Sequence, residues 1–186
     1  MEITKTRFAG LLLIKPAIFR DQRGYFFESY NLKTFRDHGI DIPFVQDNQS
    51  RSTFGTIRGL HYQLNPFAQA KLLRVLEGKI LDVSVDLRQN SSTFHEYFSV
   101  ELSEENQLQI LIPGGFAHGF AVLSHTATVL YKCDNLYHPE AERGIYYADP
   151  DLNINWHLAD SEIIISAKDT GFPRLKDAEM NFYPKT

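Results

Sequence analysis

The apolar positions along this chain recur with a period of two. Leu81, Val83, Val85 and Leu87 alternate with polar residues, and successive side chains of a β-strand point to opposite faces of a sheet. The same alternation returns at residues 98–102, 108–112, 116–122 and 127–131, with turn-forming residues between the runs. Short strands at this spacing are typical of an antiparallel sandwich or barrel, so the sequence predicts an all-β fold.

Helix signals are confined to short segments near the two ends of the chain. Residues 31–38 can form a helix with Asn31 as its N-cap and Gly39 as its terminator. The tail after Ser166 can supply another turn or two. No internal repeat, low-complexity tract or flexible linker interrupts the chain. We therefore expect a single domain over residues 1–186, with short helical segments in N- and C-terminal arms around the β-core.

Charge and cysteine content indicate which partners and which cellular compartment to expect. Its 186 residues include 19 basic and 23 acidic side chains, a net charge of −4, so we expect no general attraction to nucleic acid or to an anionic membrane. No apolar stretch of the sequence suits a membrane-spanning segment. Cys133, the only cysteine, cannot form an internal disulfide, which fits a reducing compartment. We expect a soluble cytoplasmic protein.

Two motifs lie where a cupin barrel places its signature strands. Pro113, Gly115 and His118 match the second cupin motif, and residues 59–63 occupy the place of the first. Metal-binding cupins carry a His-x-His pair and a carboxylate in that first motif, and a facial metal site needs at least three ligands. Here His61 lacks the second histidine. The sequence therefore predicts no metal site.

Five blocks of the chain carry a more specific signal, at residues 58–63, 69–72, 82–88, 112–120 and 166–169. Their order and spacing resemble those of the dTDP-4-dehydrorhamnose 3,5-epimerase family over about residues 8–175. This resemblance implies a dimeric jelly-roll cupin that needs no cofactor. It also implies an isomerase that inverts the two carbons flanking the ketone of a dTDP-linked 4-keto-6-deoxyhexose, in the synthesis of dTDP-L-rhamnose.

The chemistry of such a reaction agrees with the residues that are present. Epimerisation beside a ketone needs a base, a group that stabilises the enolate, and an acid that returns a proton to the opposite face. The resemblance implies that His61 is the base and that Asp169 orients its ring. It also implies that Lys71 lies beside the oxygen where charge develops, and that Tyr131 is the acid.

Substrate-binding residues follow from the same resemblance. Arg23 and Arg58 are selected for the diphosphate, because a planar guanidinium satisfies two phosphate oxygens at once. The other predicted contacts are Phe26, Glu28, Gln46, Asp47, Asn48, His118, Tyr137, Glu142 and Lys168. A homodimer is implied as well, in which the N-terminal arm around Phe26 completes the site of the partner.

Several of these residues also have a structural interpretation. Asp169 follows the apolar run at residues 163–165 and could cap a helix. Lys71 suits a solvated strand edge, and Tyr131 suits a core position with a paired hydroxyl. Asp82 and Asp86 lie on one face of a predicted strand and are interpreted as structural.

Other functions fit part of the pattern. An epimerase that inverts a single carbon, or a 3,4-ketoisomerase, would keep much of this site. A non-catalytic cupin that binds a carbohydrate would keep the fold alone. The presence of His61, Lys71 and Tyr131 together favours an epimerase, and whether one carbon or both are inverted depends on how the sugar ring turns within the site.

Arg58 and His61 cannot both face the site if their strand is regular, because residues three apart on a strand point to opposite faces. A bulge or twist near Gly59 would bring both side chains to one face. The sequence therefore predicts such an irregularity.

Overall fold

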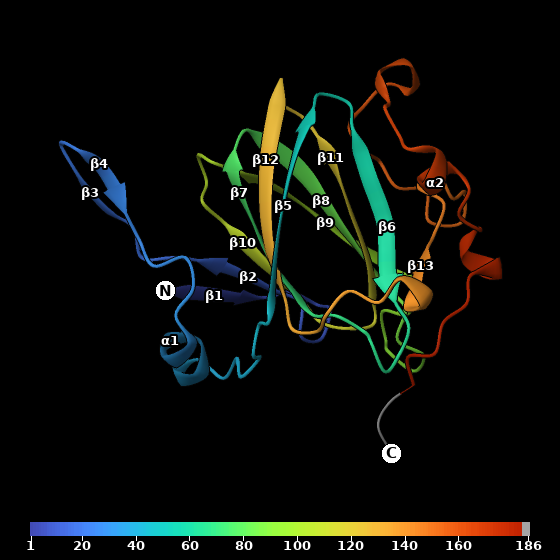
Figure 1. Ribbon diagram of the computed structural model, residues 1–186, viewed down its shortest axis with the longest axis horizontal. Helices are drawn as coiled ribbons and strands as arrows, with labels where there is room; N and C mark the ends of the chain where they lie inside the picture. Colours follow the sequence, from blue (N-terminus) through green and yellow to red (C-terminus); the bar gives the residue numbers. More distant parts are fainter. Residues whose placement is uncertain (184–186) are drawn as a thin grey trace.

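The computed structural model describes residues 1–183 and contains two antiparallel sheets that face each other (Figure 1). The larger sheet has the order β1 (Glu2–Lys5), β2 (Leu12–Lys15), β10 (Gln109–Ile112), β7 (Lys71–Glu77), β12 (Thr126–Cys133) and β5 (Gln46–Thr53). The smaller sheet has the order β13 (Glu142–Gly144), β6 (Ile57–Gln63), β11 (Phe116–Val122), β8 (Lys79–Asp86) and β9 (Tyr97–Ser103). The predicted all-β architecture is confirmed. Residues 184–186 of the predicted domain lie outside the described residues.

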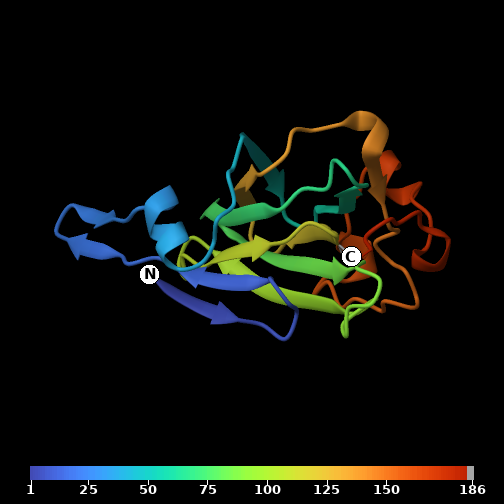
Figure 2. The same cartoon turned by 90° about the horizontal axis from the view of Figure 1, so that it is seen from below.

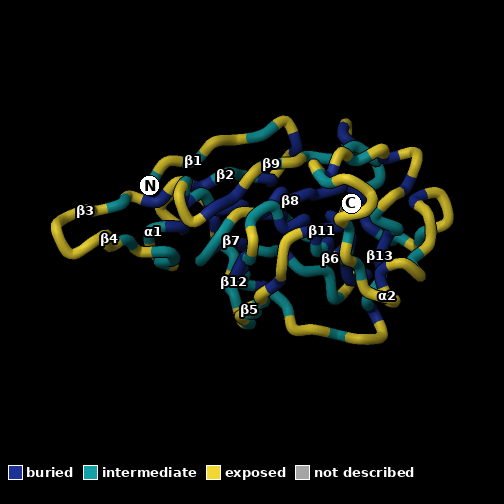
Figure 3. The backbone as a smooth tube through the Cα atoms, turned by 90° about the horizontal axis from the view of Figure 1, so that it is seen from above, coloured by how far each residue is buried: buried dark blue, intermediate teal, exposed yellow. Residues whose placement is uncertain are grey.

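Strand β11 lies in the middle of the smaller sheet and is buried along its whole length. Phe116 and Phe120 belong to the core between the sheets, together with Leu73 of the larger sheet. Ala117 and Ala121 belong to a second core on the outer face. Figure 3 shows β8 and β11 in the dark blue of buried residues. Burial of both faces explains why the sequence of β11 carries no Asp, Glu, Lys or Arg.

The chain after β13 covers the outer face of the smaller sheet, at the right of Figure 1. It contains the helical turns η2 (Asp160–Glu162), α2 (Ala167–Thr170) and η3 (Leu175–Asp177), whereas η1 (Pro139–Ala141) precedes β13. Trp156 and Leu175 of this segment share one buried cluster with Leu60 and Val83 of the sheet. The apolar cover holds α2 in contact with β6.

The helix predicted near the N-terminus is present as α1 (Leu32–Asp37). The Asn31 side chain accepts a hydrogen bond from the Thr34 N–H, which satisfies one of the free donors of the first turn. Gly39 follows the helix with a φ of 81°, a left-handed conformation that glycine adopts without a side-chain clash. Phe35 packs from α1 into a cluster on the outer face of the larger sheet.

A hairpin that the sequence pattern did not predict precedes α1. It consists of β3 (Phe19–Asp21) and β4 (Gly24–Phe26), and all of its strand residues are exposed. Both ribbon views show the hairpin projecting away from the two sheets (Figures 1 and 2). The predicted N-terminal arm is therefore present, and it lies at the opposite end of the molecule from α2.

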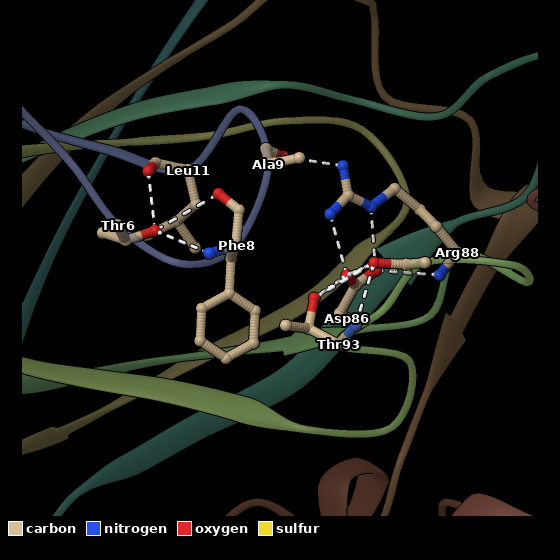
Figure 4. A network of polar contacts seen from close by, with 8 residues as sticks. Thr6, Phe8, Ala9, Leu11, Asp86, Arg88 and Thr93 are labelled. Atoms are coloured by element: carbon tan, nitrogen blue, oxygen red, sulfur yellow. Dashed lines mark hydrogen bonds and ion pairs between the residues drawn. The ribbon is translucent and has the colours of Figure 1, made fainter.

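A hydrogen-bond network around the buried carboxylate of Asp86 connects the loop between β1 and β2 to the smaller sheet (Figure 4). Asp86 accepts hydrogen bonds from the guanidinium of Arg88 and from the Thr93 hydroxyl. The remaining arm of Arg88 donates to the carbonyl of Ala9 at 2.7 Å. These hydrogen bonds offset the desolvation penalty of the buried Asp86 carboxylate and lower its pKa. The structural interpretation of Asp86 agrees with this network.

Candidate active site

A cavity of about 190 Å³ opens beside the end of β6. Its lining comes from both sheets and from the loop before β13. The lining residues are Gln46, Asn48, His61, Tyr62, Gln63, Gln69, Lys71, Tyr131, Tyr137 and Glu142. The structure therefore brings predicted catalytic and substrate-binding residues from distant parts of the sequence into one cavity.

His61 is hydrogen bonded to a buried carboxylate at the wall of this cavity. Its Nε2 lies 2.8 Å from Oδ1 of Asp169, and the Gly59 N–H donates to the second carboxylate oxygen at 3.3 Å. Burial alone would raise the pKa of Asp169, but these hydrogen bonds outweigh it and hold the pKa below its usual value. An ionised carboxylate only accepts hydrogen bonds. The His61 proton therefore lies on Nε2, which leaves the lone pair on Nδ1.

Asp169 reaches His61 because of the way α2 begins. Ser166 is the N-cap residue, and its hydroxyl accepts a hydrogen bond from the Asp169 N–H at 3.1 Å. The helix-cap interpretation of Asp169 is therefore wrong. Because Ser166 satisfies the backbone, the Asp169 side chain is available for His61.

A bulge in β6 places Arg58 and His61 on the same side of the sheet, as predicted. His61 pairs with His118 and Arg58 pairs with Phe120, so three steps along β6 match two steps along β11. Gly59 has a φ of 123°, and a Cβ at this position would lie 2.5 Å from the Cα of the facing Gly119. Only glycine fits such a close approach of two backbones.

Lys71 and Tyr131 lie side by side on the larger sheet, with the Lys71 ammonium 6.0 Å from the centre of the Tyr131 ring. Strand β7 is flanked by β10 and β12, so the strand-edge interpretation of Lys71 is wrong. Burial lowers the pKa of Lys71 and raises that of Tyr131, because both charged forms lose hydration. Within residues 1–183, neither the Lys71 ammonium nor the Tyr131 hydroxyl has a side-chain hydrogen-bond partner.

His118 forms a second histidine–carboxylate pair beside the first. Its Nε2 lies 2.7 Å from Oδ2 of Asp82, and both side chains are buried. Burial lowers the pKa of His118 and outweighs the opposing attraction of Asp82. Asp82 therefore contacts a predicted site residue, a relationship that the sequence analysis missed. The only sequence signal was its place on the same face of β8 as Ser84, inside an apolar strand.

A second cavity, of about 440 Å³, adjoins His61 on the side of α2. Its lining residues are Thr56, Ile57, Arg58, His61, Ile164, Ile165, Ser166, Lys168 and Asp169. Arg58 is exposed and donates from Nε to the Ser52 hydroxyl at 2.9 Å. No carboxylate among residues 1–183 forms an ion pair with it. The Arg58 guanidinium is therefore available to an anionic ligand.

Glu142 links the two cavities. One of its carboxylate oxygens accepts a hydrogen bond from the Tyr137 hydroxyl at 2.7 Å and another from the Lys168 ammonium at 2.6 Å. Glu142 and Tyr137 line the first cavity, and Lys168 lines the second. Burial opposes ionisation of Glu142, but these contacts prevail and lower its pKa. The three predicted substrate contacts thus form one connected group.

Gln63 holds the loop that carries Tyr137, and the sequence analysis did not select it. Its amide oxygen accepts from the His138 N–H at 2.7 Å, and its amide nitrogen donates to the carbonyl of Leu136 at 3.2 Å. Gln46, which was selected as a substrate contact, accepts from the Tyr137 N–H at 3.0 Å. These bonds support the backbone on both sides of Tyr137. The available signal in the sequence was a glutamine in the same block as His61, two residues after it.

Five predicted substrate contacts are absent from the lining of both cavities, namely the buried His118 and four residues nearer the N-terminus. Arg23 and Phe26 are on the projecting hairpin, where Arg23 pairs with Asp21 at 2.6 Å. Glu28 follows the hairpin and accepts from Asn31 at 3.1 Å. Asp47 is on the outer face of β5, paired with Lys132 at 2.9 Å, because alternate residues of a strand face opposite sides.

Two further observations concern the described residues as a whole. Residues 1–183 contain no group of three or more His, Cys, Asp or Glu side chains arranged to hold a metal ion. Over the same residues, no helix is both long enough and apolar enough to span a membrane.

Comparison with known proteins adds independent observations. A family model described as dTDP-4-dehydrorhamnose 3,5-epimerase matches residues 5–177. A curated protein of that name from Methanothermobacter thermautotrophicus is 47% identical over 174 residues, which cover 93% of this chain and 94% of that protein.

Solved structures are similar to this chain over nearly its whole length. The crystal structure of dTDP-4-dehydrorhamnose 3,5-epimerase from Elizabethkingia anophelis gives a TM-score of 0.91 at 49% identity, and the match covers 95% of this chain and 97% of that one. A 3,5-epimerase from Legionella pneumophila, solved in complex with dTDP-4-keto-L-rhamnose, gives 0.90 at 46% identity over 95% and 93% of the two chains.

Proposed function

This chain belongs to the dTDP-4-dehydrorhamnose 3,5-epimerase family, with its jelly-roll cupin fold and isomerase activity, and on this premise we propose that the cavity at His61 is where the reaction takes place. The substrate of that activity carries a ketone at C4, which makes the protons on C3 and C5 removable. Each inversion takes a proton from one face as an enolate forms, and returns a proton to the other face. The work of the residues is to hold and move these protons.

The observation that carries the proposal is the hydrogen bond of 2.8 Å between His61 Nε2 and Asp169. It places the lone pair of His61 on Nδ1, where it can accept a proton from carbon. As the ring becomes positive, the Asp169 carboxylate stabilises it, so transfer of the proton becomes less unfavourable. The His61 side chain is 32% exposed, which leaves it accessible to a ligand in the cavity.

Lys71 and His118 support the enolate and the sugar in this proposal. The Lys71 ammonium has no carboxylate partner within the described chain, so its charge can stabilise the oxygen at C4 as negative charge develops there. His118 lies opposite His61 across the β6–β11 pair, which suits a contact to the sugar. Asp82 holds its ring in place.

Tyr131 is proposed as the general acid. It lines the cavity from β12, on the larger sheet, whereas His61 lines it from β6 on the smaller one. A base and an acid on opposite walls can act on opposite faces of one sugar ring. The raised pKa of Tyr131 keeps its proton in place until the enolate accepts it.

The diphosphate of the substrate is assigned to the second cavity, at Arg58 and Lys168. Arg58 offers a guanidinium free of any ion pair with a described carboxylate, and bidentate contact with phosphate is favourable for such a group. Tyr137 and Glu142 lie at the junction of the two cavities and are assigned to the sugar, together with Asn48 and Gln46.

We further propose that the enzyme is a cytoplasmic homodimer in which each hairpin serves the site of its partner. Arg23, Phe26 and Glu28 are too far along the projecting arm to line the cavities of their own chain. The arm exposes large apolar side chains, with Phe19 66% and Phe26 68% exposed, which favours its burial against a second copy.

Proton NMR in deuterated water tests the proposal directly. With dTDP-4-dehydro-6-deoxy-D-glucose as substrate, the unaltered enzyme should place deuterium at both C3 and C5 of the product. His61→Ala should abolish exchange while the circular dichroism spectrum stays unchanged, and His125→Ala, in an exposed turn, should behave like the unaltered enzyme. Full exchange in His61→Ala would refute the base assignment. Label at one carbon alone would indicate a single epimerase, and no label would indicate a non-catalytic cupin.

A further inference from the structure

The chain that leaves α2 returns to the His61 ring through Phe172. The centres of the two rings are 5.5 Å apart with an interplanar angle of 74°, an edge-to-face contact. Such contacts have a preferred geometry because the edge of one ring carries positive and the face of the other negative partial charge. Phe172 lines neither of the two cavities. Any effect it has on the reaction is therefore indirect, and His61 is the proposed catalytic residue that its ring contacts.

The place of the Phe172 ring depends on the absence of a side chain at Gly144. Gly144 pairs with His61 across the β13–β6 ladder, and a Cβ on it would approach Cδ2 and Cε2 of Phe172 to 2.4 Å. The Phe172 ring thus covers the bare backbone beside His61. The following residue is anchored too, because the Pro173 carbonyl accepts from the Tyr146 N–H at 2.8 Å.

We propose that Phe172 is a positioning residue that holds the plane of the His61 imidazole. The bond from Nε2 to Asp169 fixes the position of one ring nitrogen, but the last side-chain torsion of histidine is intrinsically broad. Contact with the Phe172 ring restricts that torsion, so that Nδ1 keeps one direction in the cavity. Residues 166–173 thus supply both restraints on the ring. This inference rests on the proposed role of His61 as the base.

Substitution of Phe172 should lower the rate of chemistry without weakening substrate binding. For Phe172→Ala we expect kcat to fall by about tenfold, since a small misplacement of a reacting group costs one to two orders of magnitude, while KM stays within about twofold. Phe172→Tyr keeps the aromatic ring and should retain most of the activity. Phe94→Ala removes a ring that stacks on His95 outside both cavities, and it should leave kcat unchanged.

A second substitution separates positioning from a general loss of packing. Gly144→Ala should displace Phe172 and lower kcat to a similar extent in the otherwise unaltered enzyme. In the Phe172→Ala background, Gly144→Ala should lower kcat only slightly further, because the ring that the added methyl group would displace is already absent. Circular dichroism and melting temperature establish that each variant is folded at the assay temperature.

The outcomes distinguish this inference from the proposed function. Three outcomes would overturn the positioning role. The first is an unchanged kcat in Phe172→Ala, and the second is a change confined to KM. The third is an equal loss of kcat from Gly144→Ala in both backgrounds. If His61→Ala still exchanged solvent deuterium, the assignment of His61 as the base would be refuted, whatever the result for the Phe172 variants. Loss of exchange in His61→Ala together with a normal Phe172→Ala would overturn the positioning role alone.

Discussion

His61 and His118 lie directly opposite one another across the β6–β11 pair, and each is hydrogen bonded through Nε2 to a carboxylate from a different segment. The two histidines differ in their access to solvent, since the side chain of His61 is 32% exposed and that of His118 is 7% exposed. A buried imidazole gains a charge only at a large desolvation cost. The pair therefore favours His61 for proton transfer and His118 for a neutral contact.

Tyr131→Phe should separate removal of the proton from its return. His61 is untouched in this variant, so exchange of solvent deuterium into the substrate should continue with retention of configuration. Formation of inverted product should fall by about two to four orders of magnitude, the range for loss of a general acid. Proton NMR of substrate and product in deuterated water measures both. Inversion at the unaltered rate would remove Tyr131 from the mechanism.

Lys71 should set a limit to activity at alkaline pH. Its ammonium must be present to stabilise the enolate, and burial lowers its pKa. As the pH rises, the Lys71 ammonium therefore loses its charge at a lower pH than a free lysine, whose pKa is about 10.4. We expect kcat to decline as the pH rises through the lowered pKa of Lys71.

Lys71→Arg provides the control for this pH dependence. A guanidinium stays charged at any accessible pH, so this variant should lose the alkaline decline even though its maximal rate is lower. A pH profile of kcat for the two enzymes is the measurement. An unshifted decline in Lys71→Arg would assign the decline to another group.

Gly59→Ala should damage both stability and ligand binding. Its Cβ would lie 2.5 Å from the Cα of Gly119 and 2.7 Å from the His118 carbonyl, and the positive φ adds a strain of about 1–3 kcal/mol. Gly24→Ala is the matched control, because Gly24 has a φ of 127° but nothing within 4 Å of its Cβ position. Urea unfolding should show the larger loss of free energy for Gly59→Ala. Equal losses would mean that the close approach at the bulge contributes nothing.

The proposed exchange of hairpins can be tested by mixing two inactive variants. His61→Ala lacks the base and Arg23→Ala lacks the hairpin cation. If Arg23 serves the partner's site, each mixed dimer contains one intact site, so random mixing restores about a quarter of the sites. If Arg23 serves its own chain, every site lacks one residue and no activity returns. Activity after co-refolding, compared with each variant refolded alone, distinguishes the two arrangements.

The sequence by itself determined the features that depend on neighbours along the chain. The period of two assigned Phe116, His118 and Phe120 to one face of a strand, and the structure places them there. Asn31 and Gly39 delimited α1 by local capping. The parity conflict between Arg58 and His61 even located the bulge at Gly59. The spacing of the matched blocks was enough to indicate the family, because a motif is itself a local pattern.

Only the tertiary structure decided which side chains meet. His61 and Asp169 are 108 residues apart, and their contact depends on how the C-terminal cover packs on β6. Asp82 proved to be the partner of His118, and Asp47 proved to face away from the cavity. Alternation assigns a residue to one of two faces, but strand register, bulges and the segment that covers a sheet arise from packing between distant parts of the chain. Those non-local contacts assemble the candidate site.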